Sequence, residues 1–196
     1  MVESAEITGT GPLAGTLSRY RPSSPEEAAD LDRVRELLAT GGDPWSRATP
    51  LHVTASAMIV DPATRRVLLR WHARQQAWLQ VGGHADPGEN DPVQIVLREG
   101  REETGLADLA LWPGSSLVHL VIVPVTAGGH EPAHQHADLR YVLRTRTPQA
   151  ARPENPSAPL RWLPVEQALE TTTEANVRET LTRVEHLLRD APAGAG

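Results

Sequence analysis

Three glutamates on one predicted helix are the residues whose type and spacing best suit chemistry. Glu99, Glu102 and Glu103 follow one another at i, i+3 and i+4, so on a helix they share one stripe. Carboxylates this close repel one another unless a positive charge lies among them. A divalent cation that prefers oxygen ligands, such as Mg²⁺, would satisfy the cluster. The alternative is an acidic helix face that is simply solvated.

The residues around these glutamates predict where the helix begins and ends. Asp91 suits the N-cap, Pro92 the first helical position and Gln94 a capping box. Gly105 is the expected C-terminal stop. A glycine-rich loop that starts at Gly82 precedes the helix, so backbone carbonyls and amides can approach a metal or a phosphate beside the carboxylates.

This stretch resembles the signature of the Nudix hydrolase family, whose members include MutT-like proteins. The matching positions are Gly83, Glu89, Arg98-Glu99, Glu102-Glu103, Gly105 and Leu106. Two positions depart from the family pattern. Eight residues, not seven, separate Glu89 from Arg98, which we assign to an extra loop residue near Asn90. Gly100 replaces a larger apolar residue, at a cost of about 1 kcal/mol in helix propensity relative to Ala.

The resemblance implies a fold and a set of site residues. The expected fold is α/β, a Nudix-type α/β/α sandwich with a mixed sheet over about residues 48–170, with N-terminal and C-terminal helical extensions. Mg²⁺, or Mn²⁺ in its place, is expected to be held by Glu99, Glu102, Glu103 and the Gly82 carbonyl. Glu102 is the first choice for general base, although it can instead be a ligand while a residue of a later loop takes the proton. Arg98, Gly83 and Glu89 are expected to support the site.

The expected activity is cleavage of the pyrophosphate bond of a nucleoside diphosphate linked to another moiety, by attack of water on phosphorus. Such bonds resist attack because their anionic oxygens repel the nucleophile, so cations and a positioned water are needed. The alternative is a Nudix-fold module that binds or senses a nucleotide or metabolite without turnover. The intact acidic triplet favours the enzyme.

A second group of polar residues lies in the segment 128–140, which contains His130, His134 and His136. On a strand, His136, Asp138 and Arg140 point to one face. Three interpretations remain open: contacts to substrate or to a second metal at the border of a pocket, a separate zinc site, and a solvated strand end.

Two arginines near the strand predicted over 66–72 are candidates for phosphate binding. The full set of candidate substrate-binding residues is Arg70, Arg74, His134, His136 and Asp138. For each arginine the alternative is an ordinary surface charge.

The composition excludes several other chemistries. The chain of 196 residues contains no cysteine, and its 19 basic residues are all arginine. Disulfides, thiolate zinc sites, cysteine nucleophiles and Schiff-base lysines are therefore excluded. A net charge of −6 gives no electrostatic footprint for a nucleic acid polymer or an anionic membrane. We expect a soluble cytoplasmic protein of a bacterium, with a small nucleotide-type molecule as its substrate.

The rest of the chain is organised around this domain. Residues 1–47 are expected to form an N-terminal extension with one amphipathic helix, which starts at Ser24-Pro25 and could support a homodimer. The segment before it, over 1–22, is expected to be irregular or loosely paired at a sheet edge. Strands are predicted over 51–60, 66–72, 117–125, 138–145 and 160–164. Residues 171–190 are predicted to form a C-terminal helix packed on the domain, and 191–196 a disordered tail.

Overall fold

A computed structural model describes residues 11–128 and 131–191 of the chain. The helices are α1 (Pro12–Arg19), α2 (Pro25–Ala39), α3 (Pro92–Thr104), α4 (Val165–Thr171) and α5 (Ala175–Asp190), with a 3-10 turn at Pro148–Ala150. The strands are β1 (Leu51–Asp61), β2 (Arg66–His72), β3 (Ala77–Leu79), β4 (Val81–Gly83), β5 (Ala110–Leu111), β6 (His119–Val125), β7 (His134–Arg144) and β8 (Leu160–Pro164). Among the helices described, none is long and apolar enough to cross a membrane.

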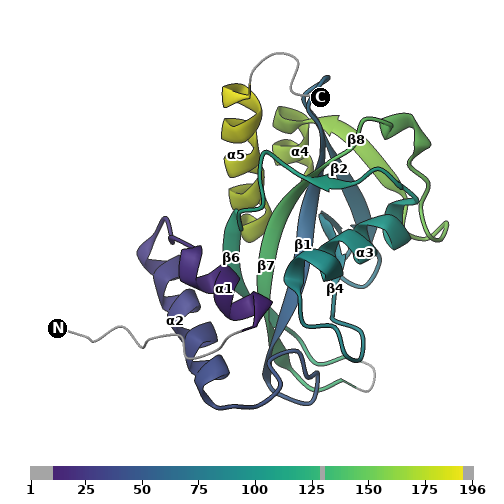
Figure 1. Cartoon of the computed structure of the whole chain (residues 1–196). Coiled ribbons are helices and arrows are strands. Elements are labelled where there is room, and N and C mark those ends of the chain that lie inside the picture. The colour runs from purple at the N-terminus through teal and green to yellow at the C-terminus, as the bar shows by residue number, and fades with distance from the viewer. Residues whose placement is uncertain (1–10, 129–130, 192–196) are drawn as a thin grey trace.

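The strands form one mixed sheet, as the sequence predicts. Its main path runs β3-β2-β1-β7-β5, and β4, β6 and β8 pair with β1, β7 and β2 respectively. The two longest strands, β1 and β7, are parallel neighbours over ten residue pairs, whereas the other pairs are antiparallel. The sheet lies between α3 on one side and α5 on the other (Figure 1).

Alternation along β1 assigns its side chains to these two layers. Val53, Ala55 and Ile59 belong to the core that α1, α2 and α3 cover. Met58 and Val60 belong to the core beneath α4 and α5. On this second face the earlier positions of the strand carry polar side chains, and there the sheet is open to a cavity.

The N-terminal extension differs from the prediction, because it contains two helices. The segment 12–19, expected to be irregular, forms α1. Pro12 starts this helix, and Leu13 and Leu17, one turn apart, are buried against the main core. Burial of these side chains outweighs the low helix propensity of Gly15. The helix predicted to start at Ser24 is confirmed, since the Ser24 side chain accepts a hydrogen bond from the Glu27 amide.

Further boundaries differ from the prediction. The C-terminal helix, predicted over 171–190, begins at Ala175 because Thr171 ends α4, and the strand predicted over 117–125 begins at His119. The last long strand begins at His134, not Asp138, because pairing with both β1 and β6 extends it. The two-residue strand β5 has no sequence signal long enough to be recognised. The predicted disordered tail falls outside the described residues after Ala191, as do His130 and the residues before Gly11.

Candidate active site

Local capping sets the position of the three glutamates on α3. The Asp91 carboxylate accepts a hydrogen bond from the Val93 amide at 2.9 Å, and Pro92 is the first helical residue. Gly105 ends the helix in the left-handed conformation with φ of 67°, which suits glycine. Both ends of the helix are therefore fixed by short-range chemistry.

Gly82 and Gly83, predicted to start the loop before α3, instead belong to strand β4 and pair with β1. Both lie directly against their neighbours. A Cβ atom at Gly82 would lie 2.5 Å from the carbonyl oxygen of Ala55, and φ at Gly82 is +140°. A Cβ atom at Gly83 would lie 2.6 Å from Oε1 of Glu99. Real Cβ atoms do not approach other atoms this closely. Only glycines therefore allow this segment to pack directly on β1 and on the acidic stripe, which we define as Glu99, Glu102 and Glu103.

Glu103 is the most buried of the three glutamates. Its Oε2 accepts a hydrogen bond from the Gly82 amide at 3.0 Å, and its Oε1 lies 3.1 Å from Nη1 of Arg70. Burial raises the pKa of Glu103 to about 7, although Arg70 and the Gly82 amide oppose this rise. Burial also raises the pKa of Glu99, against the effect of Arg98. Both carboxylates thus lie where additional positive charge would stabilise them.

Arg98 connects the acidic stripe to the loop. Its guanidinium lies 3.1 Å from Oε1 of Glu99 and 2.9 Å from Oε2 of Glu102. It also pairs with Glu89 at 2.9 Å and donates to the His84 carbonyl at 2.9 Å. The extra residue between Glu89 and Arg98 therefore does not separate them.

The acidic stripe of Glu99, Glu102 and Glu103 offers carboxylate oxygens, the ligand type that a hard divalent cation prefers. Among the described residues, however, only His52, His84 and His136 bring three ligand atoms within 4.8 Å of one another. Arg98 contacts one oxygen of Glu99 and one of Glu102. Over residues 11–128 and 131–191, the second oxygen of each carboxylate has no hydrogen-bond donor. The second oxygens of Glu99 and Glu102 are of the ligand type that Mg²⁺ or Mn²⁺ takes, whereas both oxygens of Glu103 already contact the Gly82 amide and Arg70.

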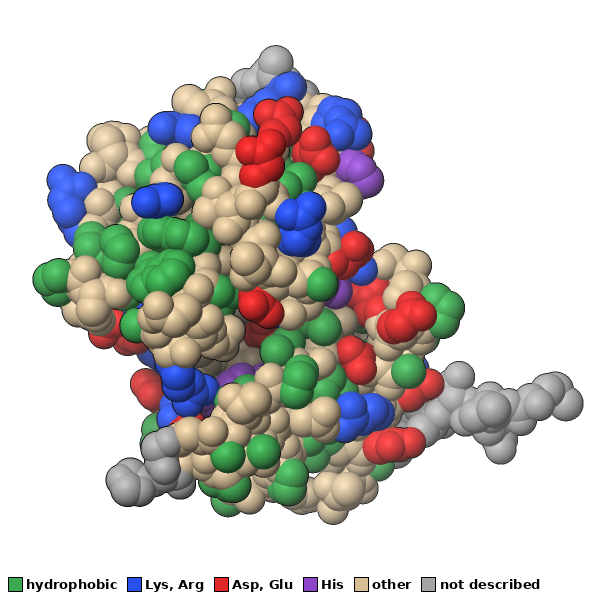
Figure 2. Space-filling view, turned by 180° about the vertical axis from the view of Figure 1, so that it is seen from behind, with side chains coloured by type: hydrophobic (Ala, Val, Ile, Leu, Met, Phe, Trp, Pro, Cys, Tyr) green, Lys and Arg blue, Asp and Glu red, His purple; other side chains and the backbone are tan. Residues whose placement is uncertain are grey.

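A cavity of about 230 Å³ opens on the face of the sheet that carries α5. Thr54 and Ser56 of β1 line it beside His136, Asp138 and Arg140 of β7. The prediction that these three β7 residues share one face is confirmed. Figure 2 shows histidine side chains, in purple, in the hollow on this side of the molecule. A larger groove of about 790 Å³ is lined by parts of α1, α5 and the segment 115–118, away from the acidic stripe, so we do not assign it to the same site.

Asp138 forms the centre of a hydrogen-bond network in the wall of the cavity. Its Oδ1 accepts from Thr54 at 3.0 Å, and its Oδ2 accepts from Ser56 and from Nε of Arg140, both at 2.8 Å. Arg140 in turn donates to the backbone carbonyl of Asn176 on α5 at 2.9 Å. Burial would raise the pKa of Asp138, but Arg140 and the two hydroxyls outweigh it and lower that pKa.

The two candidate arginines have different surroundings. Arg70 is mostly buried and contacts Glu103, as described above, with Glu154 at 3.8 Å. Arg74 is exposed, pairs with Glu131 at 3.1 Å and lines the cavity. Arg70 therefore lies at the acidic stripe, and Arg74 lies at the mouth of the cavity.

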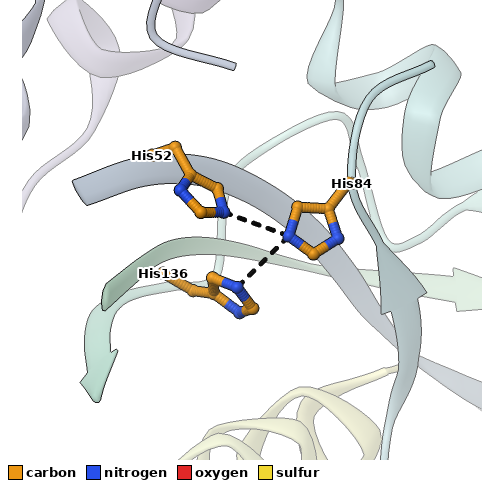
Figure 3. Close-up of side chains that lie close together, drawn as sticks. All are labelled: His52, His84 and His136. Carbon is orange, nitrogen blue, oxygen red and sulfur yellow. Dashed lines mark hydrogen bonds between the residues drawn. The ribbon is translucent and has the colours of Figure 1, made fainter. Parts of the chain in front are cut away.

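The predicted histidines His134 and His136 meet two others, His52 of β1 and His84 of the glycine loop. Figure 3 shows three of these rings pointing toward one another from separate segments of the chain. Neither His52 nor His84 is among the site residues predicted from the sequence. A signal was available for His52, since His52, Thr54 and Ser56 alternate with apolar residues in a strand that is otherwise apolar.

Similarity to known proteins covers most of the domain. The NUDIX domain family model matches residues 50–184. The chain is 31% identical over 107 residues to a probable DHNTP pyrophosphohydrolase of Lactococcus lactis, a match that covers 54% of this chain and 61% of that protein. It therefore spans less than two thirds of the length of that curated relative.

Solved structures share the fold at low sequence identity. An Ap4A hydrolase of C. elegans in a binary complex superposes with a TM-score of 0.57 at 19% identity, over 71% of this chain and 98% of that one. The dihydroneopterin triphosphate pyrophosphohydrolase of E. coli gives a TM-score of 0.52 at 18% identity, over 73% and 97% of the two chains. At such identities the likeness concerns the fold alone.

Proposed function

The chain belongs to the NUDIX domain family, and from this premise we propose that it is a divalent-metal-dependent hydrolase of a pyrophosphate bond. The proposed substrate class is a nucleoside diphosphate linked to another moiety, cleaved by attack of water on phosphorus. The observation that carries this proposal is the acidic stripe of Glu99, Glu102 and Glu103 against the Gly82-Gly83 loop.

The residues that would hold Mg²⁺ are Glu99, Glu102, Glu103 and the carbonyl of Gly82. When bound, such an ion neutralises charge on phosphate oxygens and lowers the pKa of a bound water. The spacing of the acids on one helical turn, and the open oxygens of Glu99 and Glu102 in the described structure, support this assignment. A surface that only bound a neutral ligand would gain nothing from three clustered carboxylates.

Three side chains would act as the general base and as positioning residues. Glu102 is the most exposed acid of the stripe, with 53% of its side chain accessible, so it can reach a water in the site and accept its proton. Arg98 would hold Glu99, Glu102 and the loop in one arrangement, which preserves the position of the base. Arg70 would position Glu103 through their contact at 3.1 Å.

The cavity beside the loop would receive the part of the substrate that is not cleaved. Arg74 lines the cavity and would contact phosphate or a sugar, and His136 borders it, with His134 nearby. Both oxygens of Asp138 already accept hydrogen bonds, so we propose that Asp138 acts on the substrate through the groups it orients. The named activities of the relatives suggest dihydroneopterin triphosphate and Ap4A as the first compounds to test.

The test is release of phosphate-containing products from a panel of compounds by the purified chain. The panel contains dihydroneopterin triphosphate, Ap4A, ADP-ribose and nucleotide sugars, each with Mg²⁺ and with EDTA. Turnover should require Mg²⁺. Glu102→Gln should lower the rate roughly 100- to 10,000-fold, as expected for loss of a general base.

Glu185→Gln is the matched control, since Glu185 forms an i,i+4 pair with Arg189 on α5, as Glu102 does with Arg98 on α3. It should leave the rate unchanged. Binding of a panel compound in calorimetry without turnover would support the alternative, a module that binds nucleotides. Turnover that survives in Glu102→Gln would remove that residue from the role of base.

A further inference from the structure

The four histidines come together through long-range strand pairing. His52 on β1 and His136 on β7 are direct partners in the parallel pair, so their side chains lie next to each other on the same face. His134, two residues before His136, shares this face. His84 comes from the loop after β4, which pairs with β1 on its other side. Three segments that are distant in sequence thus direct imidazoles to one point (Figure 3).

The Nε2 atoms of these rings approach one another closely. The Nε2 atom of His84 lies 3.1 Å from that of His52 and 3.2 Å from that of His136. The Nε2 atom of His134 lies 3.0 Å from that of His136. A nitrogen-to-nitrogen contact of this length needs a shared proton or a shared cation.

Backbone carbonyls fix the tautomers of the two outer rings. Nδ1 of His52 lies 3.1 Å from the Thr49 carbonyl, and Nδ1 of His134 lies 2.9 Å from the Pro132 carbonyl. A carbonyl only accepts, so each Nδ1 carries the hydrogen. In the neutral rings of His52 and His134, Nε2 therefore presents a lone pair to the centre of the cluster.

With all four rings neutral, hydrogen bonds alone cannot satisfy the cluster. Since His52 and His134 present lone pairs, His84 must donate to the first and His136 must donate to the second. The Nε2 atoms of His84 and His136 would then both carry a hydrogen and lie 3.2 Å apart, with no lone pair between them to accept a hydrogen bond. Adding a second proton to both His84 and His136 does not relieve this conflict, because it places two positively charged rings in contact. A cation that accepts all the lone pairs removes it.

We propose that His52, His84 and His136, whose ligand nitrogens lie within 4.8 Å of one another, bind a divalent transition-metal ion, best Zn²⁺. His134 lies beside this set, with its Nε2 atom 3.0 Å from that of His136. In a tetrahedral zinc site with Zn–N bonds of about 2.0–2.1 Å, ligand nitrogens lie about 3.3 Å apart. The separations of 3.1 Å between His52 and His84 and of 3.2 Å between His84 and His136 are close to that value. Carbonyls that bind the opposite ring nitrogen, as at His52 and His134, are the usual outer contacts of metal-binding histidines.

The surroundings keep the rings in the state that binds metal. Burial, then nearby charges, lowers the pKa of His84 to about 3 and that of His136 to about 4. At neutral pH both imidazoles are therefore uncharged and retain a lone pair. Nitrogen ligands favour zinc and other transition metals, whereas the carboxylates of α3 favour Mg²⁺. The two sites therefore differ in the metal they select.

The test is zinc binding by the full chain, prepared without a histidine tag and assayed with excess Mg²⁺ to occupy the carboxylates. The wild-type chain should retain one Zn²⁺ per molecule after gel filtration. His52→Gln and His136→Gln should each weaken binding by more than about 100-fold, the upper end of the loss caused by removing an outer contact. His186→Gln, at an exposed position on α5, is the control and should bind as the wild type does.

Cobalt provides a readout that does not depend on the variants folding. Co²⁺ added to the wild-type chain should give the strong visible absorption of a tetrahedral nitrogen site, and Zn²⁺ should abolish it. A chain that retains no zinc and shows only the weak spectrum of octahedral cobalt would overturn the proposal. Zinc retained equally by His52→Gln and His136→Gln would also overturn it. Neither measurement requires turnover, so failure here leaves the proposed hydrolase activity untouched.

Discussion

The His84 carbonyl accepts a hydrogen bond from Nη2 of Arg98 at 2.9 Å, while the imidazole of the same histidine lies in the cluster with His52 and His136. One residue thus joins the acidic stripe on one side of the glycine loop to the histidine cluster on the other. A shift of this loop would move both groups together. The contact between Arg98 and His84 is therefore a natural place to perturb the site.

Replacing Arg98 by lysine should reduce activity while the fold is retained. The guanidinium contacts the loop carbonyl and the carboxylates of Glu89, Glu99 and Glu102 at the same time. A lysine ammonium cannot reproduce this planar set of donors. Misplacement of a catalytic group by about 1 Å costs on the order of 100-fold in rate, so we expect a loss of that size in kcat/KM. Wild-type activity in Arg98→Lys would contradict a positioning role.

Replacing Gly83 by alanine should weaken the binding of Mg²⁺. The added Cβ would lie 2.6 Å from Oε1 of Glu99, so the carboxylate must move away from the loop. Displacing a ligand's support costs about 10- to 100-fold in metal affinity. The dependence of the rate on Mg²⁺ concentration measures the change. Gly114→Ala is the matched control, since nothing lies within 4 Å of a Cβ atom there, and it should behave as the wild type does.

Local sequence features predict the part of the site that lies on one helix. Asp91, Pro92 and Gly105 fix the ends of α3 by short-range contacts, so the register of the glutamates follows from the sequence. His52 meets His136 only because β1 and β7 pair in parallel, a contact between segments 84 residues apart in number. Helix α1 was missed for a related reason, because its stability comes from burial of Leu13 and Leu17 rather than from helix propensity.

Replacing Asp138 by asparagine should lower stability more than it changes substrate binding. Arg140 is 2% exposed, and loss of the carboxylate leaves this buried charge without its partner. Breaking a buried pair costs about 3–5 kcal/mol, which for a chain of this size lowers Tm by roughly 10 °C. Thermal unfolding followed by circular dichroism tests this. An unchanged Tm together with a raised KM would instead show direct contact of Asp138 with the substrate.

Replacing Glu27 by glutamine should destabilise the protein by about 3 kcal/mol at neutral pH, because it breaks a buried ion pair. The Glu27 carboxylate joins α2 to α5 through Arg183 at 2.8 Å and to β6 through the Leu120 amide at 3.2 Å. Tyr20 also donates to it. Urea unfolding measures the change in the free energy of unfolding. Glu26→Gln, at an exposed position on the same turn, is the control.

The contribution of the Glu27 carboxylate to the free energy of unfolding should disappear at acidic pH. Burial alone would raise the pKa of Glu27, but hydrogen bonds from Arg183, Ser23 and Tyr20 outweigh it and hold the pKa at about 2, below its ordinary value of 4.5. A carboxylate whose pKa is lower in the folded state than in the unfolded state stabilises the protein when the pH is above its ordinary pKa. This stabilisation is lost as the pH falls toward the pKa of the folded state. The difference in the free energy of unfolding between wild type and Glu27→Gln should therefore be constant above about pH 5 and shrink steadily between pH 4.5 and about 2. A difference that does not change across that range would show that Glu27 contributes by packing rather than by its charge.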